Sequence, residues 1–444
     1  MSGSKDISRR RFLSRMAQAG VAASSLLLRS SVFGQSQAPA PPQNLRIGGA
    51  PPPGGTKSVL TAADFTYLGS FRMPDTAGGQ STENSFPLTL RYVGGQLRFL
   101  GRTRQQGDQG VYEVSFPGLS KSNPPIASVA RYWGNIYGDK MVIDDQSPGG
   151  PTIVNGLYWD ETDERLYWGY GCNYSTAGTS PTIGYSTLNE STRVATAVGA
   201  YYVGSAFWKH VVGGVLAIPS SWAAQYTGGK RLGAGFGGHF SGQGASLGPT
   251  LYAFAPPSGA HRSTMTSTTL VAFAGVSQAE GTRPQRCYRN TDYRAEFSPP
   301  WNPSGNPLHG WWQWNDAMAQ SGVWIDTGTK HGVLYGCRQG HGRLWYQSSD
   351  QWAESGSDAW FIINPADLAR AAQGSLAADL VVPTEYQVQY PEESYPIGGW
   401  SGLATSNAPA FAFDATNNRL YVGRPVGWMS GMSAHMLVHC YQVS

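Results

Sequence analysis

Arginine, histidine and aromatic residues concentrate in the segments that separate the apolar runs of this chain. The densest of these segments, residues 275–321, contains CYRNTDYRAEFSPPWNPSGNPLHGWWQWND. An insertion of this length in a compact domain is typical of a lid or a binding loop. Aromatic faces stack on sugar rings, and guanidinium groups pair with carboxylate or sulfate. The composition therefore predicts a groove for a glycan and favours an anionic one.

The same residue types suit β-elimination of a uronate polysaccharide. An Arg or a protonated His would neutralise the uronate carboxylate, a Tyr or His would remove the C5 proton, and a Tyr would protonate the leaving oxygen. The catalytic candidates are Tyr174 and Tyr293 as acid and base, His210 and His239 in support, and Arg289 and Arg338 on the carboxylate. The candidates for substrate binding are Arg102, Arg104, Asn173, Trp208, Tyr288, Trp312, His341, Trp400 and Arg424.

A glycoside hydrolase is the first alternative, because such enzymes use a pair of carboxylates. Asp144, Asp145, Asp292 and Glu296 are loop carboxylates that could serve. The expected innermost strands begin SFPLTL, TIVNGL, FWKHVV, SGVWI and NAPAFAF, and none of these starts carries an acid. In the propeller glycosidases that this architecture resembles, the acids stand at those starts, so the difference weakens a transfer of their mechanism.

Other classes of site have weaker signals. His210, His239 and His341 could converge on a metal ion, but no HxH, HExxH or EF-hand spacing supports such a site. We therefore predict no cofactor and leave a bound metal ion open. No GxSxG, dinucleotide or phosphate-loop motif is present. A non-catalytic glycan-binding or surface protein fits the aromatic residues equally well.

Five segments of the chain share one pattern of strands and turns, and the loops of these segments carry the candidate residues. Each has an apolar strand, a polar turn, a second apolar strand, a variable loop and a third strand, as in FAFDATNNRLYVGR at residues 411–424. The turns GG, DETDE, GG, DTGTKHG and DATNN are rich in residues that tolerate positive φ. A fourth strand follows four of the units, and the spare strand at 65–74 could complete the fifth. The pattern predicts an all-β fold, a five-bladed β-propeller closed by an N-terminal outer strand, with six or seven blades as the alternative.

In propellers generally, ligands bind where second-to-third-strand loops and blade-to-blade loops gather. The first set is expected at residues 102–110, 170–182, 233–249, 337–357 and 424–435. The second set is expected at 75–87, 134–152, 204–210, 275–321 and 391–408. Short helices are expected at 219–226 and 365–374, where apolar spacing is briefly helical.

The first residues resemble a twin-arginine export signal. SRRRFLS, with Arg9 and Arg10, precedes a short apolar run at 17–28 that is too short to span a membrane. We expect a signal at 1–34, a disordered Pro/Gly-rich spacer at 35–60 and the propeller at 61–444, with export to the periplasm or the medium. Residues 1–34 carry +5 of a whole-chain charge of +4, so the rest is near −1 and gives no support to a nucleic-acid partner. Four Cys are too few for a disulfide scaffold. We also expect that the protein is a monomer and that it has no membrane span.

Several stretches are similar to a group of exported bacterial proteins without an assigned activity. The stretches are YLGSFRMP, VLAIPSSW, GASLGPTLYAFAPP and FIINPADLARAAQG, and the resemblance covers most of residues 65–444. It implies an exported propeller and no particular reaction.

Overall fold

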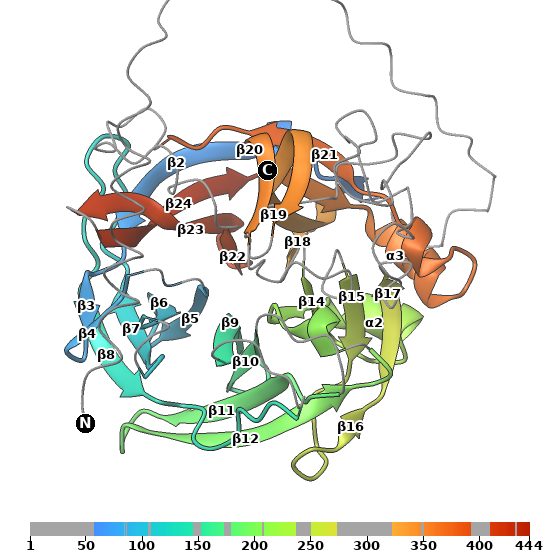
Figure 1. The fold of residues 1–444 in the computed structure, drawn as a ribbon, viewed down its shortest axis with the longest axis horizontal. Helices are drawn as coiled ribbons and strands as arrows, with labels where there is room; N and C mark the ends of the chain where they lie inside the picture. The colour runs from blue at the N-terminus through green and yellow to red at the C-terminus, as the bar shows by residue number, and fades with distance from the viewer. Residues whose placement is uncertain are drawn as a thin grey trace, which may run out of the picture. The chain divides into compact units, whose positions relative to one another are not determined.

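A computed structural model of the chain describes residues 57–444 apart from 84, 86, 105–107, 145–151, 173–178, 207, 237–249, 273–321, 348–349, 392–408 and 431–432. At 209, 337–347, 350–357, 426–430 and 433–434 the structure describes the backbone alone. Within this part the protein is nearly all β, and five small sheets form a ring (Figure 1). The five-bladed propeller is therefore confirmed.

Each blade is a meander of four antiparallel strands, numbered from the axis outward. Blade 1 contains β5 (Thr89–Val93), β6 (Gln96–Arg102), β7 (Val111–Ser115) and β8 (Val129–Gly134). Blade 2 contains β9 (Thr152–Asp160), β10 (Arg165–Cys172), β11 (Ile183–Asn189) and β12 (Val194–Val203). Blade 3 contains β13 (Val215–Ala217), β14 (Leu232–Phe236), β15 (Thr250–Phe254) and β17 (Ser267–Val271).

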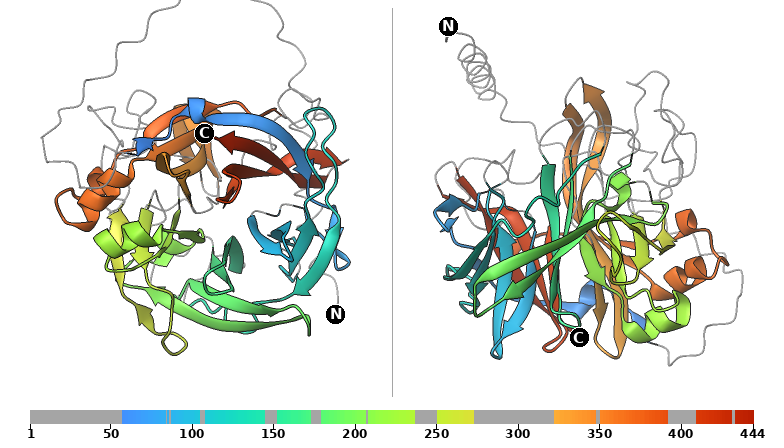
Figure 2. Two further views of the ribbon diagram at one scale, coloured as in Figure 1. Left: turned by 180° about the vertical axis from the view of Figure 1, so that it is seen from behind. Right: turned by 90° about the horizontal axis from the view of Figure 1, so that it is seen from below.

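The last two blades have the longest hairpins. Blade 4 contains β18 (Val323–Asp326), β19 (Lys330–Gln347), β20 (Asp350–Ile363) and β21 (Thr384–Val388). Blade 5 contains β22 (Ala410–Asp414), β23 (Arg419–Ser430), β24 (Ser433–Val443) and β2 (Phe65–Arg72). The hairpin of β19 and β20 projects beyond one end of the ring (right view of Figure 2).

Short elements decorate the blades. They are β1 (Ser58–Val59), η1 (Ala62–Asp64), β3 (Thr76–Ala77), β4 (Gln80–Ser81), η2 (Trp208–Val211), α2 (Ser220–Tyr226), β16 (Thr264–Met265), α3 (Pro365–Ala372) and η6 (Ala378–Leu380). The two helices predicted from apolar spacing are thus confirmed as α2 and α3. The Asn364 side chain accepts a hydrogen bond from Ala366 N at 2.9 Å and so caps α3.

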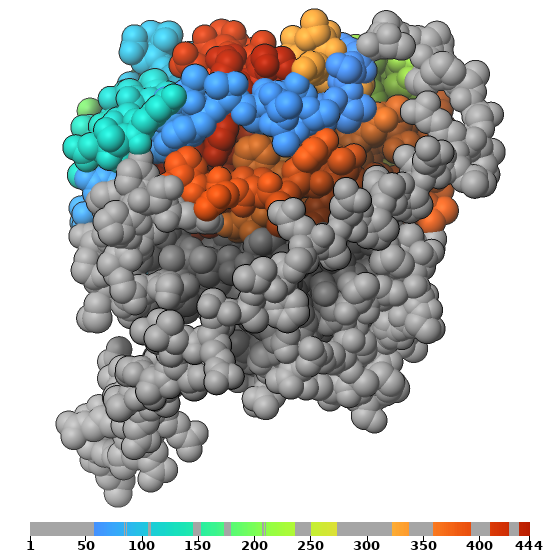
Figure 3. Space-filling view, turned by 90° about the horizontal axis from the view of Figure 1, so that it is seen from above, coloured from blue at the N-terminus to red at the C-terminus, as the bar shows by residue number. Residues whose placement is uncertain are grey.

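The N-terminal strand closes the ring. β2 pairs with β24 from Phe65 opposite Val443 to Arg72 opposite Leu437, which confirms the predicted closure. In Figure 3 the blue N-terminal residues lie against the red C-terminal ones on the outer surface. Strand β1 also pairs with β19, and Leu60 is 1% exposed. Residues 57–60, predicted to belong to the spacer, are therefore part of the propeller.

Five apolar clusters, one at each junction between blades, hold the ring together. In β6, Phe99 packs with Tyr421 of blade 5, whereas its neighbour Leu100 packs with Leu157 of blade 2. Successive side chains of a strand point to opposite faces of the sheet, so each blade contributes to two clusters. The inner strands contact each other in the closed order β5, β9, β13, β18, β22 and back to β5.

The prediction for the third repeat was wrong in its register. Its GG pair, Gly213 and Gly214, was expected to be the hairpin turn, but it precedes the innermost strand β13, and α2 lies in the connection to β14. The pair permits a close approach to blade 2. A Cβ on Gly156 would lie 2.1 Å from the Gly213 carbonyl oxygen, and one on Gly169 would lie 2.8 Å from Gly214 Cα. Glycine is therefore needed at both of these positions on the blade 2 side of the contact.

Candidate functional site

The strand order gives the ring two different ends. The hairpin end carries the first turn of each blade, at residues 94–95, 161–164, 218–231, 327–329 and 415–418. The loop end carries the second-to-third-strand connections and the blade-to-blade connections, because antiparallel strands alternate in direction. Most of the residues predicted to bind or cleave a glycan belong to segments that leave the loop end.

Arg102, the last residue of β6, is completely buried. Its Nε donates to the Val154 carbonyl of blade 2 at 2.9 Å, and its Nη1 donates to the Thr103 carbonyl at 2.9 Å. Burial lowers the pKa of Arg102 to about 10, although Tyr137 and Tyr112 oppose that shift. In the described structure this predicted substrate ligand joins blades 1 and 2.

Arg104 lies two residues further along and is 41% exposed. Its Nη1 lies 3.1 Å from Glu83 Oε2, and its backbone N–H donates to the Ser81 carbonyl. An exposed pair of this kind contributes only about 0–1 kcal/mol to stability. Arg104 could therefore leave Glu83 and bind a ligand with little loss in the free energy of unfolding.

Trp208 and His210 occupy the short helix η2 and are 4% and 0% exposed. The His210 carbonyl accepts a hydrogen bond from Thr250 Oγ1 at 2.5 Å, and Tyr335 Oη donates to the Thr250 carbonyl at 3.1 Å. The segment that carries both predicted residues is thus tied to blades 3 and 4. Both side chains are buried, so neither is open to a ligand in this structure.

Arg424 is 3% exposed and belongs to the contact between blades 4 and 5. Its Nη2 lies 2.9 Å from Asp358 Oδ2, and its guanidinium carbon is 4.1 Å from the ring centroid of Tyr390. Tyr390 in turn stacks on His439, with 5.7 Å between ring centroids. Arg424, Tyr390 and His439 therefore form a continuous buried stack beneath the loop end.

Most of the remaining candidates lie outside the described residues. They are Asn173, Tyr174, His239, Tyr288, Arg289, Tyr293, Trp312 and Trp400, together with Asp145, Asp292 and Glu296. Arg338 and His341 are described by their backbone alone, on β19 opposite Asp358 and Ser355. Their assignments remain predictions.

Asp144 is the hydrolase candidate that the structure describes. Its Oδ2 accepts a hydrogen bond from Tyr202 Oη at 2.5 Å and pairs with Arg262 Nη2. Burial alone would raise the pKa of Asp144, but the bonds from Arg262 and Tyr202 outweigh it and lower that pKa. A carboxylate held ionised in this way is poorly suited to act as a general acid.

Sequence reasoning missed an axial cavity of about 340 Å³. All five innermost strands line it, from Thr89 of β5 to Asp414 of β22, and its lining reaches the hairpin turns. The walls are largely apolar, with Leu90, Leu157, Leu216, Val323, Trp324, Phe411 and Phe413 among the lining residues. Exposed residues at its hairpin end include Glu161, Ala217 and Thr416.

Three aspartates that end inner strands line this cavity and repeat one local structure. Oδ1 of Asp160, Asp326 and Asp414 accepts the N–H two residues later, at 3.1, 2.9 and 3.0 Å. This Asx turn starts the first hairpin of each of these blades. The sequence signal was the Asp that opens the turns DETDE, DTGTKHG and DATNN, which we used for the fold and not for a cavity.

Each aspartate also reaches another part of the ring. Asp160 makes a bidentate pair with Arg231 of blade 3 at 3.1 and 2.8 Å. Lys57 Nζ lies 2.7 Å from both oxygens of Asp326. Asp414 Oδ2 accepts from Tyr92 Oη at 2.9 Å, and burial followed by this bond raises the pKa of Tyr92 to about 12.

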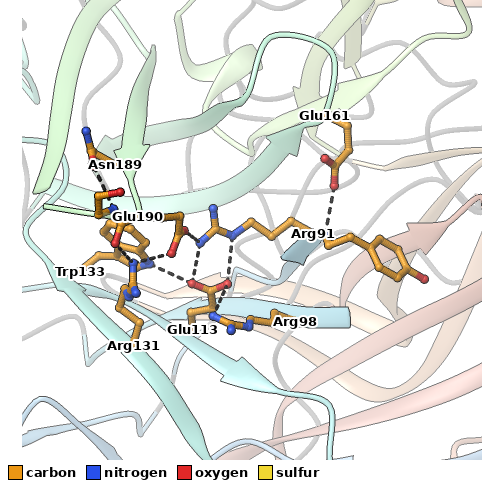
Figure 4. Close-up of polar contacts among 10 residues, drawn as sticks. Arg91, Arg98, Glu113, Arg131, Trp133, Glu161, Asn189 and Glu190 are labelled. Carbon is orange, nitrogen blue, oxygen red and sulfur yellow. Dashed lines mark hydrogen bonds and ion pairs between the residues drawn. The ribbon is translucent and has the colours of Figure 1, made fainter. Parts of the chain in front are cut away.

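An ionic network centred on the buried pair of Arg91 and Glu113 joins blades 1 and 2 and was also missed (Figure 4). Arg91 of β5 donates through Nε and Nη2 to both oxygens of Glu113, at 3.0 and 2.7 Å, and also binds Glu190. Trp133 Nε1 donates to Glu113 at 3.1 Å, and Arg131 reaches Glu190. Burial alone would lower the pKa of Arg91, but its bonds to Glu113 and Glu190 raise it. The pair of Arg91 and Glu113 is buried, whereas Glu190 is 38% exposed, so the network runs from the interior to the surface at the junction of blades 1 and 2.

A comparison with protein-family models gives no match, and neither does a search of curated proteins. Within the described part of the chain, no helix is long and apolar enough to cross a membrane. Among the same residues, no group of three or more His, Cys, Asp or Glu could hold a metal ion.

Proposed function

We propose that this protein is an exported carbohydrate-active propeller that binds an anionic polysaccharide at the loop end and cleaves it by β-elimination. The observation that supports the proposal most is the closed ring of five blades. It directs five second-to-third-strand connections and five blade-to-blade connections to one end. Those connections contain most of the Arg, His, Tyr and Trp candidates, so residues far apart in sequence belong to one end of the ring.

In this proposal a tyrosinate of Tyr174 or Tyr293 removes the proton from C5 of the uronate. The electron pair of the C5–H bond forms the C4–C5 double bond, the bond from C4 to the glycosidic oxygen breaks, and a tyrosine hydroxyl protonates that oxygen. Arg289 and Arg338 neutralise the carboxylate and stabilise the charge that develops in the transition state. His210 is buried, so in this proposal it does not touch the substrate. It positions η2, the short helix that precedes blade 3.

The test is a panel of uronate-containing and neutral polysaccharides incubated with the mature protein. The ultraviolet absorbance of the new double bond and the number of reducing ends are followed together, and the proposal expects both to rise. Tyr174→Phe and Tyr293→Phe identify the acid and base, and loss of the responsible hydroxyl should lower the rate about 100-fold or more. Tyr386→Phe on β21 is the matched control.

Two other outcomes would overturn the lyase. Reducing ends without absorbance would indicate a hydrolase, and Asp292→Asn and Glu296→Gln would then be the variants to make. Binding without product would indicate the second candidate, a glycan-binding propeller. Asp144, the hydrolase candidate that the structure describes, is held in an ion pair with Arg262, which favours the glycan-binding propeller over the hydrolase.

Export is tested separately. Replacing the twin arginines, in the double variant Arg9→Lys and Arg10→Lys, should retain the protein in the cytoplasm, and cell fractionation would show it. Equal export of the variant and the natural chain would contradict a twin-arginine signal.

A further inference from the structure

The axial cavity lies along the innermost strands and reaches the hairpin end, and the proposed glycan chemistry does not use it. We propose that this cavity is a second binding site, and that it takes a small organic cation with an aromatic or aliphatic body. This inference is independent of the lyase proposal, because it concerns other residues at the other end of the ring.

The size and walls of the cavity fit a small ligand. Its volume of about 340 Å³ lies within the range of roughly 300–1,000 Å³ that is typical of ligand pockets. Apolar side chains from all five blades line it, including Leu90, Leu157, Leu216, Val323 and Phe411. The rigid ring holds these strands in place, so the pocket is formed before a ligand arrives.

The charge of the lining selects for a cation. The described part of the lining contains Asp160, Glu161, Asp326 and Asp414, and it contains no Lys, Arg or His. Arg231 pairs with Asp160 and Lys57 pairs with Asp326, and both cations lie outside the lining. These two carboxylates therefore contribute little net charge.

Among the described residues, no Lys, Arg or His forms an ion pair with Asp414 or Glu161. Neutral groups bind Asp414, namely Tyr92 Oη at 2.9 Å, Asn417 Nδ2 at 2.7 Å and the Thr416 N–H at 3.0 Å. Glu161 Oε1 accepts the Tyr92 N–H at 3.2 Å. Arg419 is opposite Asp414 in the β22–β23 ladder, and its charge opposes the rise in the pKa of Tyr92 that burial causes, but it is absent from the described lining and forms no ion pair with Asp414. The net charge of the described lining is thus negative. Because the apolar walls have a low dielectric constant, this charge acts strongly inside the cavity and favours an ammonium group.

The direct test uses three probes of similar size and shape. They are 2-phenylethylammonium, 2-phenylethanol and 3-phenylpropanoate, measured on the mature protein by calorimetry and by saturation-transfer NMR. The proposal expects the ammonium to bind best, the alcohol more weakly and the carboxylate least. Raising the ionic strength should weaken the ammonium and leave the alcohol unchanged.

Two pairs of variants locate the binding. Ala217→Trp fills the cavity from an exposed position at the end of β13 and should abolish binding of the ammonium, whereas Val194→Trp, at a 55% exposed position on β12, should not. Glu161→Gln keeps the acceptor for the Tyr92 N–H but removes a charge, so it should weaken the ammonium about threefold. The matched control is Glu164→Gln, in the same exposed turn but outside the lining.

Three results would overturn the proposal. The first is no binding of the ammonium at millimolar concentration. The second is equal or tighter binding of the carboxylate or the alcohol, which would remove the selection by charge. The third is binding of the ammonium that survives Ala217→Trp, which would place it outside the cavity. None of these results bears on cleavage of a polysaccharide at the loop end.

Discussion

The hairpin end and the loop end of this propeller use charged residues in different ways. At the hairpin end, Asp160, Asp326 and Asp414 occupy the same position in three blades and form the same turn. At the loop end, Arg102 donates to backbone carbonyls while Arg424 pairs with Asp358. The hairpin end is thus built from a repeated unit, whereas the loop end is built from individual contacts that differ from blade to blade.

The largest expected effect is at the loop end. Arg424→Ala leaves Asp358, with a side chain 2% exposed, without this cation, and breaking a buried pair costs about 3–5 kcal/mol. Chemical denaturation would measure the loss of unfolding free energy. The double variant Arg424→Met with Asp358→Leu should recover part of it, because it leaves no unpaired charge. A loss below about 1 kcal/mol in the single variant would mean that the pair is not an essential contact.

A smaller effect is expected for the repeated aspartates. Asp160→Ala removes both an Asx turn and the bidentate bond to Arg231, and hydrogen bonds to charged groups contribute about 1.5–3 kcal/mol. Asp160→Asn keeps the turn acceptor and should lose less. Thermal unfolding of the two variants would separate the turn from the ion pair. Equal losses would show that only the charge matters at this position.

Acid should weaken the hairpin end through Asp64. Burial would raise the pKa of Asp64, but bonds from Lys330 and Thr61 outweigh it and lower that pKa. A carboxyl whose pKa is lower in the folded state stabilises the fold above its unfolded pKa of about 3.9 and loses that contribution as pH falls through the folded value. Unfolding free energies from pH 7 down to pH 3 should therefore fall more for the natural chain than for Asp64→Asn, by about 1 kcal/mol. Parallel curves would contradict this linkage.

The smallest effect on stability is expected for Arg104→Ala. The side chain is 41% exposed and its pair with Glu83 should contribute less than about 1 kcal/mol. Its effect on retention by an acidic polysaccharide should be larger, because a phosphate- or carboxylate-like group would lose a guanidinium partner. Arg193→Ala, in an exposed turn of blade 2, is the control for a general change of charge. Equal retention of both variants would remove Arg104 from the proposed glycan site.

The difference between the two ends also explains what could be predicted from the sequence. The apolar strands and the polar turns between them recur five times, and the spare strand at 65–74 completes the fifth unit. These features predicted five blades and their closure. The GG pair at 213–214 was wrongly predicted to be a hairpin turn. Glycine is used in tight turns, but here it allows a close approach to Gly156 and Gly169. Burial of Arg102, His210 and Arg424 could not be predicted, since it depends on contacts between blades that share no sequence pattern.

The most direct test of two separate sites is gel retardation by an acidic polysaccharide. The natural protein, Ala217→Trp and Arg104→Ala would be compared on the same gels, with neutral polysaccharide as reference. Separate sites predict that filling the cavity with Ala217→Trp leaves retardation unchanged, while Arg104→Ala reduces it. Absence of retardation in the natural protein, or its loss in Ala217→Trp alone, would contradict a glycan site at the loop end that is distinct from the axial cavity.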